Sequence, residues 1–146
     1  MRPLTVINGG EGFWVNAEST LTLQLPTGTA IASTTFADQA FGTNNLPQGW
    51  SLISTGDSPT PNGFVNSLAL TQPVTPDVAA TSLTTLWAWD SALTNWYFYA
   101  PSLDNAGTLT NYITNKNYED FTAKGKTLDQ TTGFWVNHPQ QELHQM

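Results

Sequence analysis

The strongest constraint on this chain is a repeat of five residues, Gly-Phe-Trp-Val-Asn, found at 12–16 and again at 133–137. The match extends backward, because Ile7-Asn8 aligns with Leu128-Asp129 ahead of a turn rich in Gly or Thr. A repeat of this kind predicts that the chain holds the tail of one repeat unit followed by one whole unit. We therefore divide the single domain, residues 1–146, into a truncated unit (1–25), a linker (26–48), a complete unit (49–138) and a flexible tail (139–146).

The composition indicates a packed, β-rich domain. Aromatic residues make up 12% of the chain and charged residues only 10%, so the chain can bury a large apolar area and builds its polar surface from uncharged side chains. Alternating apolar patterns and Gly- or Pro-containing turns predict an α+β fold with antiparallel sheet, one or two short helices and a possible pseudo-twofold relating the repeated strands. The predicted strands are 4–7, 13–15, 20–25, 49–54, 83–90, 96–99, 118–121 and the second repeat copy.

Two helices are predicted between these strands. The first follows Thr60-Pro61, where threonine can cap a helix and proline suits its first position. The second runs from about Asp104 to Asn115, capped by Ser102 and stopped at Lys116-Asn117.

Charge and cysteine content remove several function classes. The net charge is −7 and the only cations are Arg2, Lys116, Lys124 and Lys126, so no basic surface for nucleic acid is expected. The absence of cysteine removes disulfides, thiolate catalysis and Cys-based zinc sites. No apolar run is long enough for a signal peptide or a membrane span, so we expect no membrane association and, for the chain as it stands, a cytoplasmic location.

Five segments in a fixed order carry a resemblance to a known repeat module. They are Gly49-Trp50-Ser51-Leu52-Ile53, Leu86-Trp87-Ala88-Trp89-Asp90, the run Trp96 to Leu103, Tyr112-Ile113 through Tyr118, and Gly133-Phe134-Trp135-Val136-Asn137. This set resembles a module of large exported or cell-surface proteins of Gram-negative bacteria, which opens with a Gly-Trp-Asn-Leu-like strand, carries a Trp-x-Trp hairpin and closes with a Gly-(Phe/Tyr)-Trp-Val strand.

The resemblance covers roughly residues 48 to 138, and the closing motif recurs at 9 to 17. It implies a structural or adhesive module, because the family has no established activity and no catalytic residues to carry over. The chain departs from the family by lacking an export signal and the start of its first unit. A stand-alone reading frame cut from a repeat protein, such as a mobile gene fragment, is expected to look like this.

No convincing catalytic or metal-binding set is present, and no cofactor is expected. His138 and His144, with Glu142, lie in or beside the tail, where a catalytic triad or a metal site is not expected. The best acidic pair for glycoside hydrolysis is Asp90 with Asp104. Both also stand where aspartate serves local hydrogen bonding, at a hairpin loop and in the first turn of a helix.

The aromatic hairpin is the feature with the clearest functional meaning. Trp87 and Trp89 share one face of a strand, and in the next strand Trp96 alternates with Tyr97 and Tyr99. A packed core is the first interpretation; an exposed partner surface and a glycan platform are the alternatives. The candidate surface residues are Trp96, Tyr97, Tyr99, Asp90 and Asp104.

The repeated strand raises a question of partners. Phe13 and Trp14 match Phe134 and Trp135, but the first copy has lost the unit that it would close. An unpaired apolar strand invites association, so we expect either a compact monomer or an exchanged dimer. The leading function is a non-catalytic structural or interaction module; the alternative is a carbohydrate-binding module, and a hydrolase is less favoured.

Overall fold

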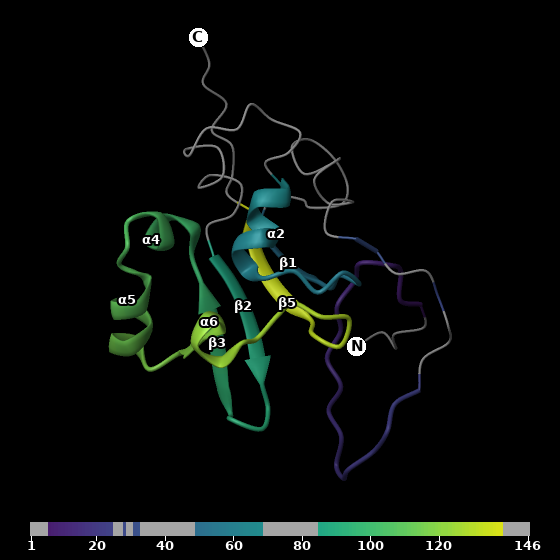
Figure 1. The fold of residues 1–146 in the computed structure, drawn as a ribbon. Coiled ribbons are helices and arrows are strands. Elements are labelled where there is room, and N and C mark those ends of the chain that lie inside the picture. The colour runs from purple at the N-terminus through teal and green to yellow at the C-terminus, as the bar shows by residue number, and fades with distance from the viewer. Residues whose placement is uncertain (1–5, 25–27, 29–30, 33–48, 69–84, 139–146) are drawn as a thin grey trace.

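The computed structural model describes residues 6–24, 28, 31–32, 49–68 and 85–138. All of its helices and strands lie between Gly49 and His138 (Figure 1). The strands are β1 (Gly49–Ile53), β2 (Thr85–Asp90), β3 (Asn95–Tyr99), β4 (Glu119–Asp120) and β5 (Phe134–His138). The helices are α2 (Pro61–Leu68), α4 (Pro101–Asn105), α5 (Leu109–Lys116) and α6 (Phe121–Lys124).

The five strands form one sheet in the order β1-β5-β2-β3-β4. Every pairing is antiparallel except β3 with β4, which is parallel. The second repeat copy is therefore an inner strand, with Phe134 opposite Ile53 of β1 on one side and Ala88 of β2 on the other. The predicted β-rich α+β fold is confirmed.

The hairpin of β2 and β3 was the clearest strand prediction and is confirmed. Asp90 ends β2, and its Oδ1 atom accepts hydrogen bonds from the backbone N–H groups of Ala92 (2.9 Å) and Leu93 (3.1 Å). Thr94 then adopts a positive φ of 51°, which completes the reversal into β3. An aspartate at the start of a turn thus has the local bonding role that its position predicts.

The helix prediction was right at α2 and wrong for the segment after β3. The hydroxyl of Thr60 accepts a hydrogen bond from the N–H of Gly63 (3.0 Å), and Pro61 begins α2 as predicted. The single helix expected over 104–115 is instead two helices, because the chain breaks at Gly107 with φ 73°. Pro101 begins α4 after an Ala100 cap, so Ser102 is not the cap.

The described residues thus hold four short helices rather than one or two. The unpredicted one is α6, which replaces the end of the strand expected over 118–121. Asp120 ends β4 and caps α6, since its Oδ1 accepts from the N–H groups of Thr122 (2.8 Å) and Ala123 (3.3 Å). Asn117, at φ 61°, ends α5 at the predicted stop.

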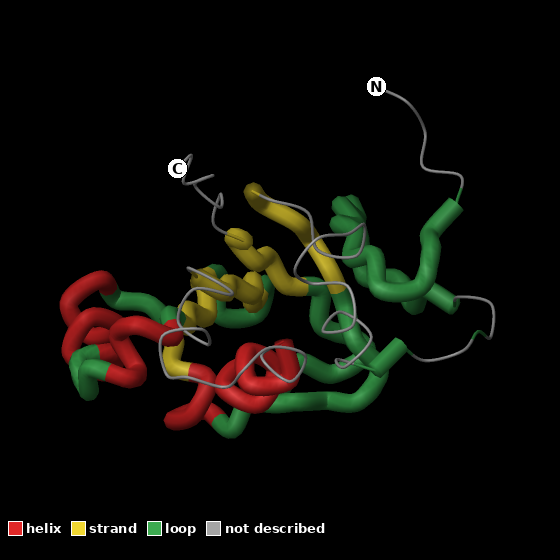
Figure 2. Tube along the Cα trace, turned by 90° about the horizontal axis from the view of Figure 1, so that it is seen from above, coloured by secondary structure: helices red, strands yellow, loops and turns green. Residues whose placement is uncertain are grey.

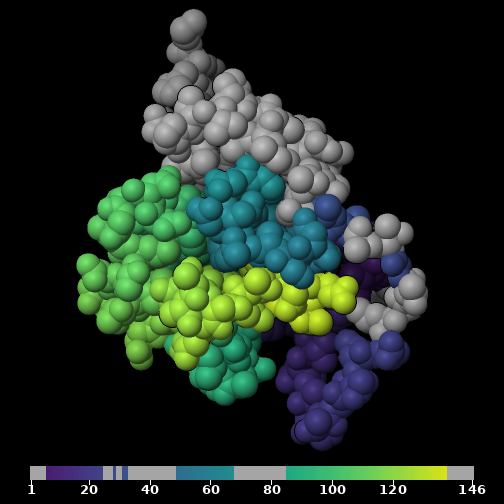
Figure 3. Space-filling model, in the orientation of Figure 1, coloured from purple at the N-terminus to yellow at the C-terminus, as the bar shows by residue number. Residues whose placement is uncertain are grey.

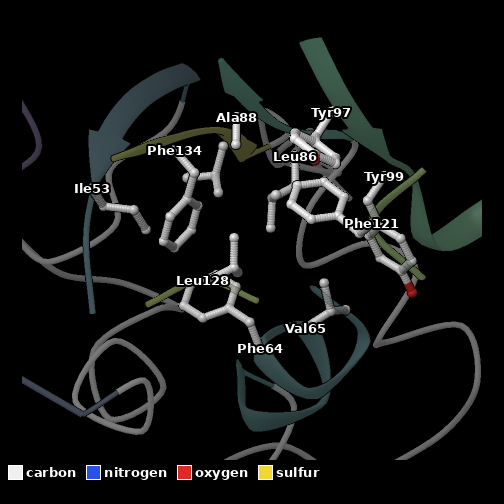
Figure 4. Close-up of a cluster of buried hydrophobic side chains, with 11 residues drawn as sticks. Ile53, Phe64, Val65, Leu86, Ala88, Tyr97, Tyr99, Phe121, Leu128 and Phe134 are labelled. Atoms are coloured by element: carbon white, nitrogen blue, oxygen red, sulfur yellow. The ribbon is translucent and has the colours of Figure 1, made fainter. Parts of the chain in front are cut away.

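The main core lies on one face of the sheet, where α2, α6 and the segment around Leu128 cover it (Figure 4). Phe64 of α2 packs edge-to-face on Phe134 with ring centroids 5.2 Å apart, and both rings are fully buried. The covering segment is held by the Leu128 N–H, which donates to the Pro59 carbonyl (2.8 Å), and by the Leu128 carbonyl, which accepts from the buried Thr55 hydroxyl (3.0 Å).

A smaller cluster lies on the other face, at the β3 end of the sheet. It centres on the buried Phe98, Ala100 and Ile113, with Tyr112 and Tyr118 packed against them. Here α4 and α5 cover only part of the sheet. Toward β5 and β1, this face carries the side chains of Trp50, Leu52, Trp135 and Asn137.

The N-terminal segment differs from its predicted form. Residues 13–15 and 20–24 are not strands, and Leu21 and Leu23 are exposed instead of half-buried; Figure 2 draws the whole described segment 6–24 as loop. A single antiparallel bridge, Glu11 with Ile53, joins it to the outer edge of β1. In Figure 3 most of the segment projects from the strand-bearing body. The expected twofold between two matching strands is therefore not formed.

Some predictions fall outside the described residues. Only residues 28, 31 and 32 of the predicted linker are described, and the predicted tail, 139–146, is not. The division of the chain into a truncated and a complete unit remains a prediction.

Candidate functional site

One face of the sheet gathers the tryptophans of the chain. Alternation along β1, β5, β2 and β3 places five of the six on the face opposite the main core, and the sixth, Trp14, reaches the same face from the N-terminal segment. We call this the tryptophan face. Its tryptophans are Trp14, Trp50, Trp87, Trp89, Trp96 and Trp135.

Four of these rings pack on one another at the hairpin end. Trp96 is the centre, with ring centroids 5.1 Å from Trp89, 6.2 Å from Trp87 and 6.1 Å from Trp14, all edge-to-face. The Nε1–H of Trp87 donates to the Thr85 hydroxyl at 3.0 Å. This end of the face is a cluster of edge-to-face rings in which Trp87, Trp89 and Trp96 are partly buried and Trp14 is exposed.

The other end of the face is open at Trp50, whereas Trp135 and Asn137 are partly buried. Trp50 and Trp135 make no ring contact among the described residues, and Trp50 is 56% exposed. Trp50 lies directly opposite Asn137, and Trp135 lies two residues before Asn137 on the same strand. An amide is therefore adjacent to two tryptophans whose rings contact no other ring in the part of the chain that the structure describes.

The first repeat copy starts at the outer edge of β1 and then crosses to this face. Its Gly12 N–H donates to the Leu52 carbonyl at 3.1 Å. A Cβ atom on Gly12 would lie 2.7 Å from Leu52 Cγ and 3.1 Å from the Ile53 oxygen, so only glycine fits there. A Cβ on the matching Gly133 would lie 3.8 Å from Gly12 Cα, an ordinary contact. The two copies thus begin side by side, and the first continues to Trp14 at Trp96.

The structure separates the tyrosines from the other candidate surface residues. Tyr97 and Tyr99 are buried in the main core, on the face opposite Trp96. The Tyr99 hydroxyl donates to Asp104 Oδ2 (2.8 Å) and accepts from Asn62 Nδ2 (3.1 Å), which ties α2, β3 and α4 together. Burial, together with the Asp104 carboxylate, raises the pKa of Tyr99, so its hydroxyl remains a neutral donor.

The two candidate carboxylates are not brought together. Asp90 stands at the hairpin end of β3, beside Asn95, whereas Asp104 follows the opposite end of that strand. Asp90 bonds the hairpin turn and Asp104 bonds Tyr99. Glycoside hydrolysis needs two carboxyl groups across one sugar linkage, and this arrangement does not provide it.

Other chemistry-bearing residues add no further site in the described ranges. His138 is the last residue of β5, and His144 and Glu142 lie outside the described residues. Among the described residues, no three His, Asp or Glu side chains gather as metal ligands. No helix found in those residues has the length and apolarity to span a membrane.

Matching turns precede the two repeat copies. The N–H of Glu11 donates to the Asn8 carbonyl (3.1 Å), and at the aligned positions the N–H of Thr132 donates to the Asp129 carbonyl (2.9 Å). The Glu11 carboxylate accepts from the Asn8 backbone N–H (2.9 Å), which lowers the Glu11 pKa. Burial alone would raise the pKa of Asp129, but hydrogen bonds from Thr131 and Thr132 outweigh it, and the pKa is lowered.

No protein-family model, curated protein or solved structure matches the chain. The site is therefore interpreted from its own residues. Sequence reasoning noted Trp50 only as part of an opening motif and did not consider Asn137 as a surface residue. The available signal was the period of two, which puts Trp50 with Leu52 and Trp135 with Asn137 on one face of their strands, but only the pairing of β1 with β5 sets these residues side by side.

Proposed function

We propose that this chain is a non-catalytic structural and interaction module that associates with a second copy of itself by strand pairing. The observation that carries the proposal is the contrast between its two identical segments. Phe134 and Val136 are 0% exposed between β1 and β2, whereas Trp14 and Val15 of the first copy are 54% and 51% exposed. A segment that has the sequence of a buried strand but is itself exposed can add as a strand to the edge of another sheet.

The outer edge of β1 is the matching acceptor. Within the described residues, only the Glu11 bridge and the adjacent Gly10 and Gly12 bonds occupy that edge, and they lie at its Ile53 end. Continuing the antiparallel register from this bridge would set Phe13 opposite Ser51 and Val15 opposite Gly49. The chain's own segment leaves the edge after Gly12, so a second copy can take that register.

In this pairing, the side chains of the added strand would match those already on each face of the sheet. Trp14 would stand opposite Trp50 on the tryptophan face, while Phe13 and Val15 would continue the main-core side, as Phe134 and Val136 do in β5. Each chain carries one donor and one acceptor. Self-association of this kind agrees with the expected origin in repeats of bacterial surface proteins, where successive units lie next to one another.

The non-catalytic part of the proposal rests on how the acidic side chains are used. Asp90, Asp120 and Asp129 accept hydrogen bonds that hold turns or a helix start, and Asp104 bonds Tyr99. Acids committed to local structure are poor candidates for proton transfer.

The test is the solution mass of the full chain over a range of concentrations, by size exclusion with light scattering. We expect a concentration-dependent dimer. Trp14→Pro removes the N–H that this register points at the Trp50 carbonyl, and it should abolish the dimer. Ser19→Pro, in the same exposed segment beyond the copy, is the matched control and should leave it intact.

Two results would overturn the proposal. One is a monomer at every concentration up to the solubility limit. The other is a dimer that Trp14→Pro and Ser19→Pro weaken to the same extent, since the contact would then not depend on the repeat copy. Circular dichroism of both variants establishes that the sheet is retained.

A further inference from the structure

We infer that the open end of the tryptophan face, formed by Trp50, Asn137 and Trp135, is a binding site for a neutral oligosaccharide with equatorial hydroxyls, such as a β-linked glucan. This site goes beyond the proposed self-association. It uses side chains of β1 and β5, and none from the first repeat copy.

The inference begins with Trp50 and Trp135, which lie outside the ring cluster at the hairpin end. The other four form the edge-to-face cluster around Trp96, whereas Trp50 and Trp135 make no ring contact among the described residues. Trp50 is 56% exposed and Trp135 is partly exposed, so both indoles can contact a ligand. Gluco-configured sugars present axial C–H groups on both ring faces, and these pack on an aromatic face in the way apolar groups do.

The second step is the polar group between the rings. Asn137 is paired directly with Trp50 across the strands, and its amide offers two donors and one acceptor. Thr85, opposite Asn137 on β2, adds a hydroxyl that already accepts from Trp87 Nε1. An amide flanked by aromatic rings matches a sugar, which is apolar on its faces and hydroxylated at its rim.

The third step is charge. The strands β1, β5, β2 and β3 place on this face only uncharged side chains: Trp50, Leu52, Trp135, Asn137, Thr85, Trp87, Trp89, Trp96 and Phe98. None of these strand pairings brings a cation to the face, and the chain as a whole carries a net charge of −7. An anionic glycan would be repelled and a cationic ligand would find no counter-ion, so a neutral ligand is favoured.

Spacing completes the argument. Diagonal neighbours on antiparallel strands lie about 7–8 Å apart, and Trp50 and Trp135 are such neighbours. Two rings at this separation can contact two sugars of one chain, with Asn137 reaching the hydroxyls between them. Trp50 lies on the edge strand β1 and is 56% exposed, so an internal stretch of a long glycan can reach it from that edge.

The experiment is isothermal titration of the full chain with cellohexaose and with laminarihexaose, at concentrations where light scattering reports monomer. Trp50→Ala should weaken binding at least tenfold, and Asn137→Ala should weaken it several-fold. The matched control is Trp14→Ala, because Trp14 is exposed to nearly the same extent (54% against 56%) and lies at the packed end of the same face. It should bind as the wild type does.

Absence of heat with both hexasaccharides, confirmed by unchanged tryptophan emission, would overturn the inference. Equal losses in Trp50→Ala and Trp14→Ala would also overturn it, because the ligand would then not select the open end. If Trp50→Ala instead converts a dimer to a monomer and no sugar binds, a second copy covers the face and the carbohydrate assignment is wrong. Failure of self-association alone leaves the sugar titration unaffected, so the two proposals fail separately.

Discussion

The same sequence, Gly-Phe-Trp-Val-Asn, is an inner strand in one part of this molecule and a surface loop in another. The second copy pairs with β1 and β2 and buries Phe134 and Val136 completely. The first copy makes one bridge, at the residue before it, and then leaves the sheet. Five identical residues thus adopt two conformations, and the difference lies in their neighbours.

The turns that precede the copies are alike, and this likeness is as informative as the difference. In each, an N–H donates to a carbonyl three residues earlier, at Glu11 with Asn8 and at Thr132 with Asp129. Each turn is braced by a carboxylate within the same four residues. A turn forms from nearby residues alone, whereas a strand needs partners distant in sequence.

The largest expected difference in stability between the two copies is at their phenylalanines. Phe134→Ala should lower the free energy of unfolding by about 3–5 kcal/mol, because it removes a fully buried ring from contact with Phe64. Phe13→Ala should lower it by less than about 1 kcal/mol, because that ring is only partly buried outside the sheet. Urea unfolding followed by circular dichroism measures both. Equal losses would mean that the first copy belongs to the cooperative core.

The next effect compares the bracing carboxylates. Asp129→Asn should cost about 1 kcal/mol near neutral pH, since the carboxylate accepts from Thr131 and Thr132 and is partly exposed to water. Because the folded-state pKa of Asp129 is lowered, its contribution is fully present above the unfolded-state pKa of about 3.9. It is lost as the pH falls through the lower folded-state value.

The variant and the wild type should therefore converge in stability at low pH, as measured by urea unfolding over a pH series. Glu11→Gln is the matched change in the first turn. It should leave global unfolding unchanged and raise only the hydrogen-exchange rate of the Asn8 amide, whose acceptor is the Glu11 carboxylate. A global loss in Glu11→Gln would show that the first turn also supports the sheet.

The smallest effect concerns the glycines that open the two copies. Gly12→Ala should detach the N-terminal segment, because the new methyl meets Leu52 and the Ile53 carbonyl. Gly133→Ala should be tolerated in an ordinary contact. We expect global stability to change by less than about 1 kcal/mol in either case. The readout is the tryptophan emission of the chain, because Trp96 loses its contact with Trp14 only in Gly12→Ala; the same spectral change in both variants would contradict this.

Residues with local signals were predicted well. The β2–β3 hairpin with its Asp90 turn, the Thr60-Pro61 start of α2 and the Asn117 stop of α5 all follow from side chains that act within a few residues. The missed elements depended on single residues that ended one element or started another. Gly107 split the expected helix, and Asp120 capped α6 where a strand was predicted. The pattern of Leu21 and Leu23 predicted a strand that found no partner among the described residues.

By itself, the sequence determined the fold class, the hairpin, the matching turns and the alternation that divides aromatic side chains between two faces. These follow from bonding within a few residues and from the period of two along a strand. Only the tertiary structure decided which copy of the repeat became a strand, because that depends on access to both β1 and β2. It also decided that Trp50, Asn137 and Trp135 share the open end of one face, since residues so far apart in sequence meet only through the pairing register.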